Sequence, residues 1–276
     1  LDKELRAKAP GEYVTVANGE VHYLLEGPPD GPLVVLVHGY AIPSYLWDHT
    51  AEYLTAQGYR VLRYDLFGHG WSDRPDTDYT RQLFVEQLNG VVEQLVPGQS
   101  FDLVGISLGA LITADYAASN LSRVRHLVLI APFSTGFDIG PMSSPVIGEY
   151  LAMMALVDRL ENGLAVNFLK PENAPDWKED YRWQMQVSGY RQAMLSILRN
   201  TLQHDHYEIY NRLDNTQLPV MLLWGREDAL APFSQSEIMT QLITHAKLVA
   251  VPEAGHLVHI EGAETVDAAL SGFLQQ

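Results

Sequence analysis

Short apolar runs separated by helix-length segments constrain the fold most strongly. Six such runs have the length of a strand, at Leu33–Val37, Arg60–Asp65, Phe101–Ile106, Val124–Ile130, Val220–Trp224 and Lys247–Val251. Runs of this kind are typical of strands buried on both faces of a parallel sheet. Amphipathic stretches such as Leu46–Gln57 and Thr80–Leu95 lie between most of them. The sequence therefore predicts an α/β fold with a mostly parallel central sheet and helices on both faces.

The segment before the first of these runs has a different pattern. Tyr13–Tyr23 alternates branched and polar residues around Asn18–Gly19. Asn-Gly between alternating apolar positions is the strongest short-range signal for a tight hairpin turn. We therefore expect an N-terminal β-hairpin ahead of the parallel strands.

One long interval interrupts the alternation of strands and helices. Ser134–Leu218 separates the strand ending near Ile130 from the strand starting near Val220, which is too long for a plain loop. It contains helical patterns at Pro145–Leu160, Gly163–Leu169 and Trp177–Leu202, the last two separated by the breaker stretch Lys170–Pro175. We expect a helical cap (134–218) inserted into an α/β core (1–133 and 219–276), over the sheet edge where such folds bind ligands.

The overall charge and composition exclude several classes of function. The 276 residues include 34 acidic and 18 basic side chains, for a formal charge of −16, which repels phosphate backbones. We therefore expect no nucleic-acid partner. The absence of cysteine excludes disulfides, thiolate zinc sites and cysteine nucleophiles. No apolar run reaches the ~18 residues of a transmembrane helix, although a trimmed N-terminal leader or anchor stays open, as do compartment and oligomeric state.

The strongest local motif is Gly105–Ile106–Ser107–Leu108–Gly109, between an apolar strand and a helical pattern. Gly-x-Ser-x-Gly in a strand–turn–helix context is typical of a nucleophile elbow, in which the serine backbone is strained and the two glycines avoid collisions. The amide of Leu108 then lies at a helix N-terminus, where it can donate to an oxyanion. The motif predicts Ser107 as a nucleophile.

A serine nucleophile needs a base, and the base needs a carboxylate that orients it. His256 follows the last predicted strand and Asp228 follows the one before it, so both should lie at the same sheet edge as Ser107. His259 is expected to be structural, and Glu227 is expected to face solvent. Phe133–Ser134, after an earlier strand, offers no competing carboxylate.

The first predicted parallel strand ends in His38–Gly39–Tyr40. Gly39 permits a tight turn, and the amide of Tyr40 can serve as a second oxyanion donor beside that of Leu108. His38 is expected to be a structural hydrogen-bonding residue.

Together with Asp65–Pro75, which contains the turn Gly68–His69–Gly70, these elements resemble the α/β-hydrolase family. The chain is most similar to its serine esterase and monoacylglycerol-lipase-like branch. This resemblance implies a Ser–His–Asp hydrolase without a cofactor or a metal, and an architectural role for the glycine turn.

Neighbouring branches of the family differ from this chain at defined positions. Haloalkane dehalogenases and epoxide hydrolases have aspartate in place of Ser107, and cofactor-free haloperoxidases usually have a different oxyanion neighbourhood. Carbon–carbon hydrolases of ring-cleavage diketones typically have Trp where this chain has Leu257. The resemblance thus favours hydrolysis of a small carboxylic ester with an apolar acyl group, with lactones and thioesters still open. Carbon–carbon hydrolysis and a slow-turnover ligand receptor are the alternatives.

Two further groups of side chains have less specific interpretations. His204–Asp205–His206 has a spacing that could hold a metal, but we expect a solvated helix end. Apolar residues of the predicted cap could line an acyl pocket or simply pack together. They are Met142, Met153, Met154, Met185 and Met194, with Phe133, Phe137 and Trp183.

Overall fold

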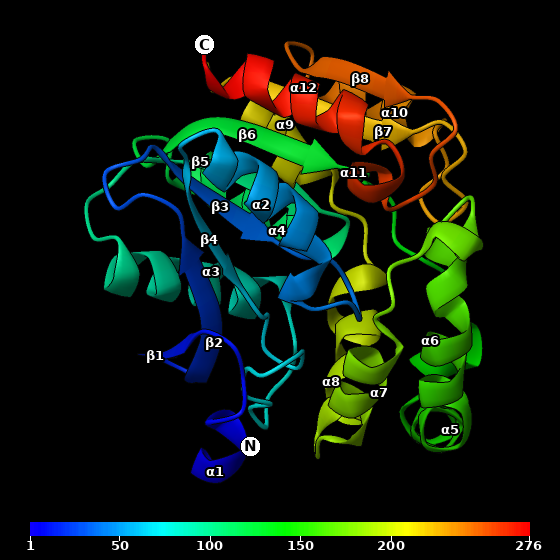
Figure 1. Cartoon of the computed structure of the whole chain (residues 1–276). Helices are drawn as coiled ribbons and strands as arrows, with labels where there is room; N and C mark the ends of the chain where they lie inside the picture. The colour runs from blue at the N-terminus through cyan, green and yellow to red at the C-terminus, as the bar shows by residue number, and fades with distance from the viewer.

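The computed structural model describes residues 1–276 apart from the side chain of Asn173, and its centre is an eight-stranded sheet (Figure 1). The strand order is β1-β2-β4-β3-β5-β6-β7-β8, antiparallel from β1 to β4 and parallel from β4 to β8. The strands are β1 Glu12–Val16, β2 Gly19–Glu26, β3 Leu33–Val37, β4 Arg60–Tyr64, β5 Phe101–Ile106, β6 Val124–Ile130, β7 Val220–Gly225 and β8 Lys247–Val251. The predicted α/β fold, its hairpin and its six parallel strands are confirmed, with strand ends shifted by at most one residue.

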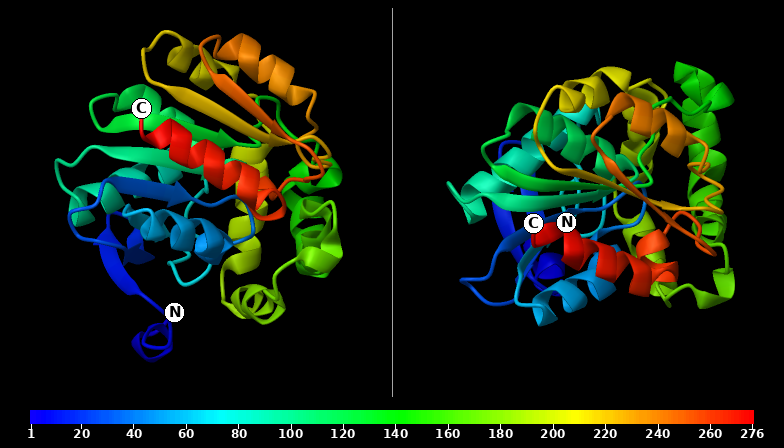
Figure 2. Two further views of the ribbon diagram at one scale, coloured as in Figure 1. Left: turned by 45° about the horizontal axis from the view of Figure 1, so that its top comes forward. Right: turned by 90° about the horizontal axis from the view of Figure 1, so that it is seen from above.

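Helices cover both faces of the sheet, as the periodicity predicted. On one face α12 (Ala263–Leu274) contacts α2 (Asp48–Ala56), and Figure 2 shows them side by side. On the other, α4 (Leu108–Ser119) contacts α3 (Arg81–Leu95) and α9 (Tyr207–Asp214), and α9 also contacts α10 (Gln235–Leu242). Every residue of β3 and β5 is buried between these layers, which explains their unbroken apolar sequence. Shorter helical segments are α1 Lys3–Arg6, η1 Ser44–Trp47 and α11 Val258–Glu261.

The segment between β6 and α9 is mainly helical and lies beyond the carboxyl ends of the parallel strands (Figure 1). Its elements are η2 Gly140–Ser143, α5 Pro145–Leu151, η3 Ala152–Leu156, α6 Val157–Gly163, η4 Leu164–Asn167, η5 Pro171–Asn173, α7 Lys178–Gln186, α8 Tyr190–Ile197 and η6 Leu198–Leu202, of which η3 and η6 are π-helical. None of the helices in the described residues combines the length and the hydropathy that a membrane span requires.

Two helix predictions in this segment were wrong. The single helix predicted over Trp177–Leu202 is divided, because Gly189 has a φ of 88° and breaks the chain direction between α7 and α8. The helix predicted over Gly163–Leu169 is only the short turn η4, since α6 already occupies the residues up to Gly163. The division into core and cap stays a prediction. Because α9 packs on α4, we propose that the cap ends before α9.

Candidate active site

Ser107 lies at the turn between β5 and α4, in a strained backbone conformation. Its φ of 54° and ψ of −116° are rarely adopted by residues other than glycine. The flanking glycines make this turn possible: a Cβ on Gly105 would lie 2.4 Å from the carbonyl oxygen of Gly109, and a Cβ on Gly109 would lie 2.2 Å from that of Val37. The serine of the motif is thus held on a crowded, rigid turn at the carboxyl edge of the sheet.

His256 and Asp228 form a buried hydrogen-bonded pair at the same edge. The Nδ1 atom of His256 lies 2.8 Å from Oδ2 of Asp228. Because Gly225 of β7 is paired with Val251 of β8, the loops that carry these two residues leave adjacent strands. The other carboxylate oxygen of Asp228 accepts the amides of Leu230 and Ala231, each at 2.8 Å. The carboxylate is therefore fixed from both sides, and it orients the imidazole with Nε2 free.

The two neighbouring candidates occupy different surroundings. Glu227 is exposed and accepts the amide of Ala254 at 3.2 Å. His259 is fully buried in α11, with its ring against Trp47 and Nε2 3.2 Å from the carbonyl oxygen of Leu46. Burial, with minor contributions from nearby histidines, lowers the pKa of His259 to about 3. His259 is therefore a neutral packing residue, as its position in the sequence predicted.

The turn after β3 passes directly beside Ser107. Val37 is paired with Gly105 in the parallel β3–β5 ladder, so Tyr40 and Ser107 leave adjacent strands at the same edge. A Cβ on Gly39 would lie 3.3 Å from the Cβ of Ser107, so glycine allows this close approach. The amide of Leu108, in the first turn of α4, has no acceptor within its own helix. The amides of Tyr40 and Leu108 thus belong to the two turns that flank the serine.

The side chain of His38 stabilises this turn through buried hydrogen bonds. It is fully buried, its Nε2 accepts the amide of Leu66 at 2.8 Å, and its Nδ1 lies 2.7 Å from the carbonyl oxygen of Gly39. Burial lowers the pKa of His38 to about 4, against a smaller opposing effect of Asp65. The ring is thus neutral near pH 7 and acts structurally, as the sequence predicted.

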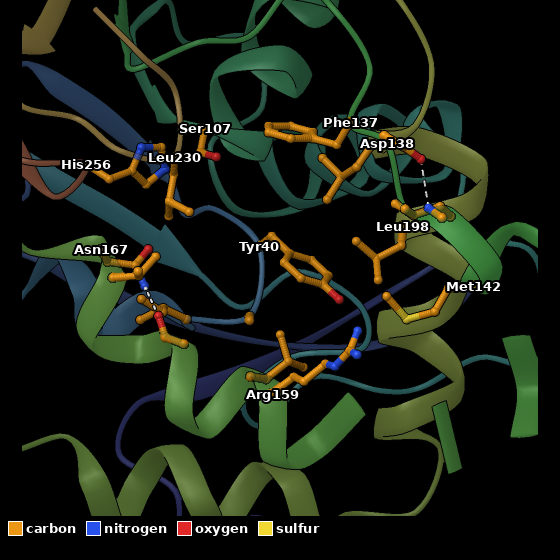
Figure 3. Close-up of a pocket in the computed structure, with 18 of the residues that line it drawn as sticks. Tyr40, Ser107, Phe137, Asp138, Met142, Arg159, Asn167, Leu198, Leu230 and His256 are labelled. Atoms are coloured by element: carbon orange, nitrogen blue, oxygen red, sulfur yellow. Dashed lines mark hydrogen bonds between the residues drawn. The ribbon is translucent and has the colours of Figure 1, made fainter. Parts of the chain in front are cut away.

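A cavity of about 620 Å³ opens in front of Ser107 and His256, between the sheet edge and the helices that follow β6 (Figure 3). Its walls are mainly apolar, and include Ile42, Phe137, Ile139, Met142, Leu160, Val166, Leu198, Leu202 and Leu230. Figure 3 shows Ser107 and His256 side by side at one end, with Met142 and Arg159 further away. The arrangement can hold a mainly apolar ligand with one reactive group beside the serine.

Comparison with known proteins shows the family to which this chain belongs. The model of the alpha/beta hydrolase family matches residues 34–268. The chain belongs to the α/β hydrolase family. It is 28% identical over 245 residues to the pimeloyl-[acyl-carrier protein] methyl ester esterase of Nitrosomonas europaea, with 84% of this chain and 91% of the relative covered.

A second relative and one solved structure extend the comparison for this α/β hydrolase. The 2-hydroxymuconate semialdehyde hydrolase of Pseudomonas putida is 28% identical over 230 residues, covering 82% of this chain and 80% of the relative. A thermophilic esterase from Thermogutta terrifontis superposes with a TM-score of 0.81 at 22% identity, with 96% and 98% of the two chains covered. The family includes both ester and carbon–carbon bond hydrolases, so family membership alone does not select the reaction.

Of the eight residues considered for an acyl pocket, only Phe137 and Met142 line the large cavity of this hydrolase. Met153 and Met154 are exposed by 57% and 59%. The ring of Trp183 stacks on that of Trp71, with 3.7 Å between the ring centroids. The remaining three belong to other surroundings: Phe133 and Met194 are fully buried, and Met185 lines a separate cleft. Most of the methionines therefore pack or face outwards.

The segment His204–Asp205–His206 is not the solvated helix end that we expected. His206 is buried against Phe133, and its Nε2 lies 3.0 Å from the carbonyl oxygen of Thr201. Asp205 accepts the amide of Gly136 at 2.9 Å. The two-residue spacing serves a tight turn before α9, in which one histidine packs inwards while His204 is exposed. Among the described residues, no group of three metal-ligating side chains comes together.

Several residues that sequence reasoning missed support the site. Gln184 of α7 donates to the carbonyl oxygen of Ala41 at 2.7 Å and accepts the amide of Gly70 at 3.0 Å, connecting the segment after β6 to the turn beside Ser107. His69, in the expected architectural turn, accepts the amide of Ala41 at 3.1 Å. Asn167 lines the large cavity with His256. No local motif marks Gln184 or Asn167, because both act through contacts with distant segments.

Proposed function

We propose that this protein is a serine hydrolase that cleaves carboxylic esters through an acyl-enzyme intermediate. Ser107 is the nucleophile, His256 the general base and Asp228 the carboxylate that orients it. The observation that supports this assignment best is the buried 2.8 Å bond from His256 Nδ1 to Asp228, with Ser107 and His256 together at one end of the cavity. A histidine held in this way presents its free Nε2 to a serine hydroxyl.

In the first half of the reaction, Ser107 Oγ attacks the ester carbonyl carbon while His256 Nε2 takes the hydroxyl proton. The carbonyl oxygen becomes an oxyanion, which the amides of Tyr40 and Leu108 stabilise. His256 then gives the proton to the leaving alcohol as the carbon–oxygen bond breaks. Asp228 stays ionised throughout and stabilises the imidazolium.

In the second half, water attacks the carbonyl carbon of the acyl-enzyme while His256 Nε2 takes one of its protons. When the tetrahedral intermediate collapses, the bond to Ser107 Oγ breaks and the same proton returns to the serine. The carboxylic acid leaves, and the enzyme is restored without a cofactor or a metal.

The substrate class follows from the lining of the cavity. Mainly apolar side chains surround a space of about 620 Å³, and Arg159 is the one Lys or Arg among its lining residues in the described part of the chain. Burying an apolar chain contributes roughly 0.8 kcal/mol per methylene group. We therefore propose a small ester with an apolar acyl group, in line with the methyl ester esterase among the relatives.

The test is the replacement of Ser107 by alanine, assayed on p-nitrophenyl esters of increasing acyl length. We expect turnover to fall by at least about 10⁴-fold while the thermal unfolding curve remains cooperative. Ser188→Ala, at an exposed position between α7 and α8, serves as the matched control and should keep full activity. Turnover that survives in Ser107→Ala contradicts the assignment.

A second candidate is hydrolysis of a carbon–carbon bond next to a ketone by the same three residues. The similarity to 2-hydroxymuconate semialdehyde hydrolase favours it, since that relative is as similar in identity as the esterase. The buried Leu257 beside His256, where such hydrolases typically have Trp, disfavours it. Assaying one preparation on a p-nitrophenyl ester and on a vinylogous diketone distinguishes the two: a higher kcat/KM on the diketone selects the second candidate.

A further inference from the structure

A second, much smaller cavity adjoins Ser107 and His256. Its volume is about 20 Å³, close to the minimum of roughly 10–15 Å³ that one water molecule requires. Four of its lining residues have polar side chains: Ser107, His256, Asn167 and Tyr40. The hydroxyl of Tyr40 already donates to the carbonyl oxygen of Met194, which leaves the other three for a water. The rest of its wall is apolar or backbone, and includes Ile42, Leu46 and Leu257. A buried water usually makes two to four hydrogen bonds, so this cavity has the size and polarity to bind one.

The orientation of the Asn167 side chain is set by its own turn. Its Nδ2 donates to the carbonyl oxygens of Leu164 at 2.9 Å and Gly163 at 3.3 Å. Because two carbonyl acceptors surround the nitrogen, the opposite orientation of the amide would place oxygen against oxygen. The acceptor Oδ1 receives no hydrogen bond from the described residues, and Figure 3 shows it turned towards the side where His256 and Ser107 lie.

Asn167 is also fixed in position relative to His256. The amide of Leu257, the residue after the proposed base, donates to the carbonyl oxygen of Asn167 at 3.1 Å. The carboxylate of Glu261 accepts the amide of Gly255 at 2.7 Å, and those of Leu169 and Lys170 at 3.0 and 2.9 Å. One carboxylate thus holds the segment after Asn167 and the loop before His256 together.

We propose that Asn167 is a further catalytic residue, which binds the water that hydrolyses the acyl-enzyme. The proposal rests on the proposed function, because it assigns a role in the second half of that reaction. Asn167 Oδ1 accepts a hydrogen bond from one O–H of the water, and His256 Nε2 accepts a hydrogen bond from the other. The lone pair on the water oxygen then faces the acyl carbon attached to Ser107.

The covalent chemistry balances without another reactant. The water oxygen forms a bond to the acyl carbon, and His256 Nε2 takes the proton that faces it. The bond from carbon to Ser107 Oγ breaks, and His256 returns the proton to that oxygen. Asn167 gains and loses no proton. Its hydrogen bond only orders the water, so attack by the serine hydroxyl in the first half does not use it.

This division between the two halves gives a specific kinetic test. Asn167→Ala removes the acceptor, and Asn167→Leu replaces it with an apolar group of similar size. Each variant is mixed with a p-nitrophenyl ester. The nitrophenol burst reports acylation, and quenched samples analysed by intact mass report the decay of the acyl-enzyme. Each velocity is divided by the burst amplitude, which measures the concentration of enzyme that can be acylated. The resulting rate constants therefore refer only to folded enzyme, and partial unfolding of a variant does not lower them.

We expect the acyl-enzyme to decay about tenfold or more slowly in both variants, because a hydrogen bond to the attacking water is lost, while acylation stays within about threefold. Asn200→Ala is the matched control. This asparagine lies in η6, away from both cavities, and donates to Ser196 Oγ at 2.9 Å. It should leave both rates unchanged.

Two results would overturn the proposal: an acyl-enzyme decay rate equal to that of the unmodified protein, or acylation and decay that slow by the same factor. Neither result contradicts the proposed function. That function is contradicted by different results: turnover of the ester by Ser107→Ala, or the absence of an acyl adduct on Ser107. The two failures are therefore distinguishable within one set of experiments.

Discussion

The carboxylate of Asp228 is shared between His256 Nδ1 and two backbone amides, all at 2.8 Å. Four lone-pair directions are available on a carboxylate, and three of them are occupied by donors from the loop after β7 and the loop after β8. The pair therefore keeps its geometry before any substrate binds, which is the preorganisation that acid–base catalysis requires.

Asp228→Asn should lower kcat by about 10³–10⁴-fold on a p-nitrophenyl ester, because an amide no longer stabilises the imidazolium and can select the wrong tautomer of His256. Glu227→Gln is the control, since Glu227 is exposed and its carboxylate accepts the Ala254 amide rather than a hydrogen bond from His256. It should change kcat by less than about threefold. A larger loss in Glu227→Gln than in Asp228→Asn would transfer the role to Glu227.

The glycines of the turn around Ser107 should be intolerant of any side chain. A Cβ on Gly109 would lie 2.2 Å from the Val37 carbonyl oxygen, so Gly109→Ala must displace β3 or the start of α4. We expect a loss of about 2 kcal/mol or more in the free energy of unfolding, measured by urea denaturation, together with lost activity.

Gly272 provides the opposite case, because nothing lies within 4 Å of a Cβ there and the residue is inside α12. Gly272→Ala should raise the free energy of unfolding by about 0.5–1 kcal/mol and leave activity unchanged. If Gly109→Ala and Gly272→Ala changed the free energy of unfolding equally, close packing around the added Cβ would not explain the loss expected at Gly109.

Much of the sheet could be predicted because its signal is local. A strand buried on both faces must be apolar throughout, and a Gly-x-Ser-x-Gly turn between such a strand and a helix can form only one kind of bend. The positions of His256 and Asp228 followed because residues after parallel strands meet at one edge. His38 was also predictable, since its residue type and place after β3 are enough to put it under the turn.

The segment after β6 was less predictable because tertiary contacts decide its structure. Gly189 sits inside a helical pattern, and only its φ of 88° shows that the chain turns there. His206 lies in a polar sequence, yet packing on Phe133 buries it. Asn167 carries no motif, and its place beside His256 depends on Glu261, a residue 94 positions later in the chain.

Glu261→Gln tests this long-range connection. The amide nitrogen of glutamine would face backbone donors, so at least one of the three hydrogen bonds to Gly255, Leu169 and Lys170 is lost. We expect kcat to fall several-fold and the free energy of unfolding to fall by about 1–3 kcal/mol. Glu264→Gln, an exposed position in the first turn of α12, should change neither quantity. An unchanged kcat in Glu261→Gln would mean that the His256 loop keeps its position without the hydrogen bonds to the Glu261 carboxylate.

His259 predicts a specific dependence of stability on pH. Its pKa is about 3 in the folded protein and about 6.5 in an unfolded chain, so below pH 6.5 only the unfolded state takes up the proton. Stability is therefore lost as the pH falls from about 6.5 towards 3, by about 1–2 kcal/mol between pH 6.5 and 5. Urea denaturation at pH 7.5, 6.5 and 5 measures this loss.

In His259→Phe, whose ring can still pack on Trp47, the decline between pH 6.5 and 5 should be about 1–2 kcal/mol smaller than in the unmodified protein. His204→Gln is the control, because His204 is exposed, and it should retain the full decline. A decline that is identical in His259→Phe and the unmodified protein would assign the acid sensitivity to other groups.

The acyl preference of the enzyme should depend on the wall of the large cavity. Met142 and Phe137 are the two members of the methionine and aromatic set that line it, whereas Met153 is exposed by 57%. Met142→Trp adds volume at the end of the cavity away from Ser107 (Figure 3). The kcat/KM values for p-nitrophenyl esters from two to twelve carbons report the space that remains. We expect kcat/KM for the longest chains to fall by about tenfold or more relative to the acetate, because the added ring occupies space that the packed cavity wall cannot recover without strain.

Met153→Trp should leave kcat/KM unchanged for the whole series. An equal fall for every chain length in Met142→Trp would place the acyl group elsewhere, on the side of Leu230 and Asn167, and assign this end of the cavity to the alcohol.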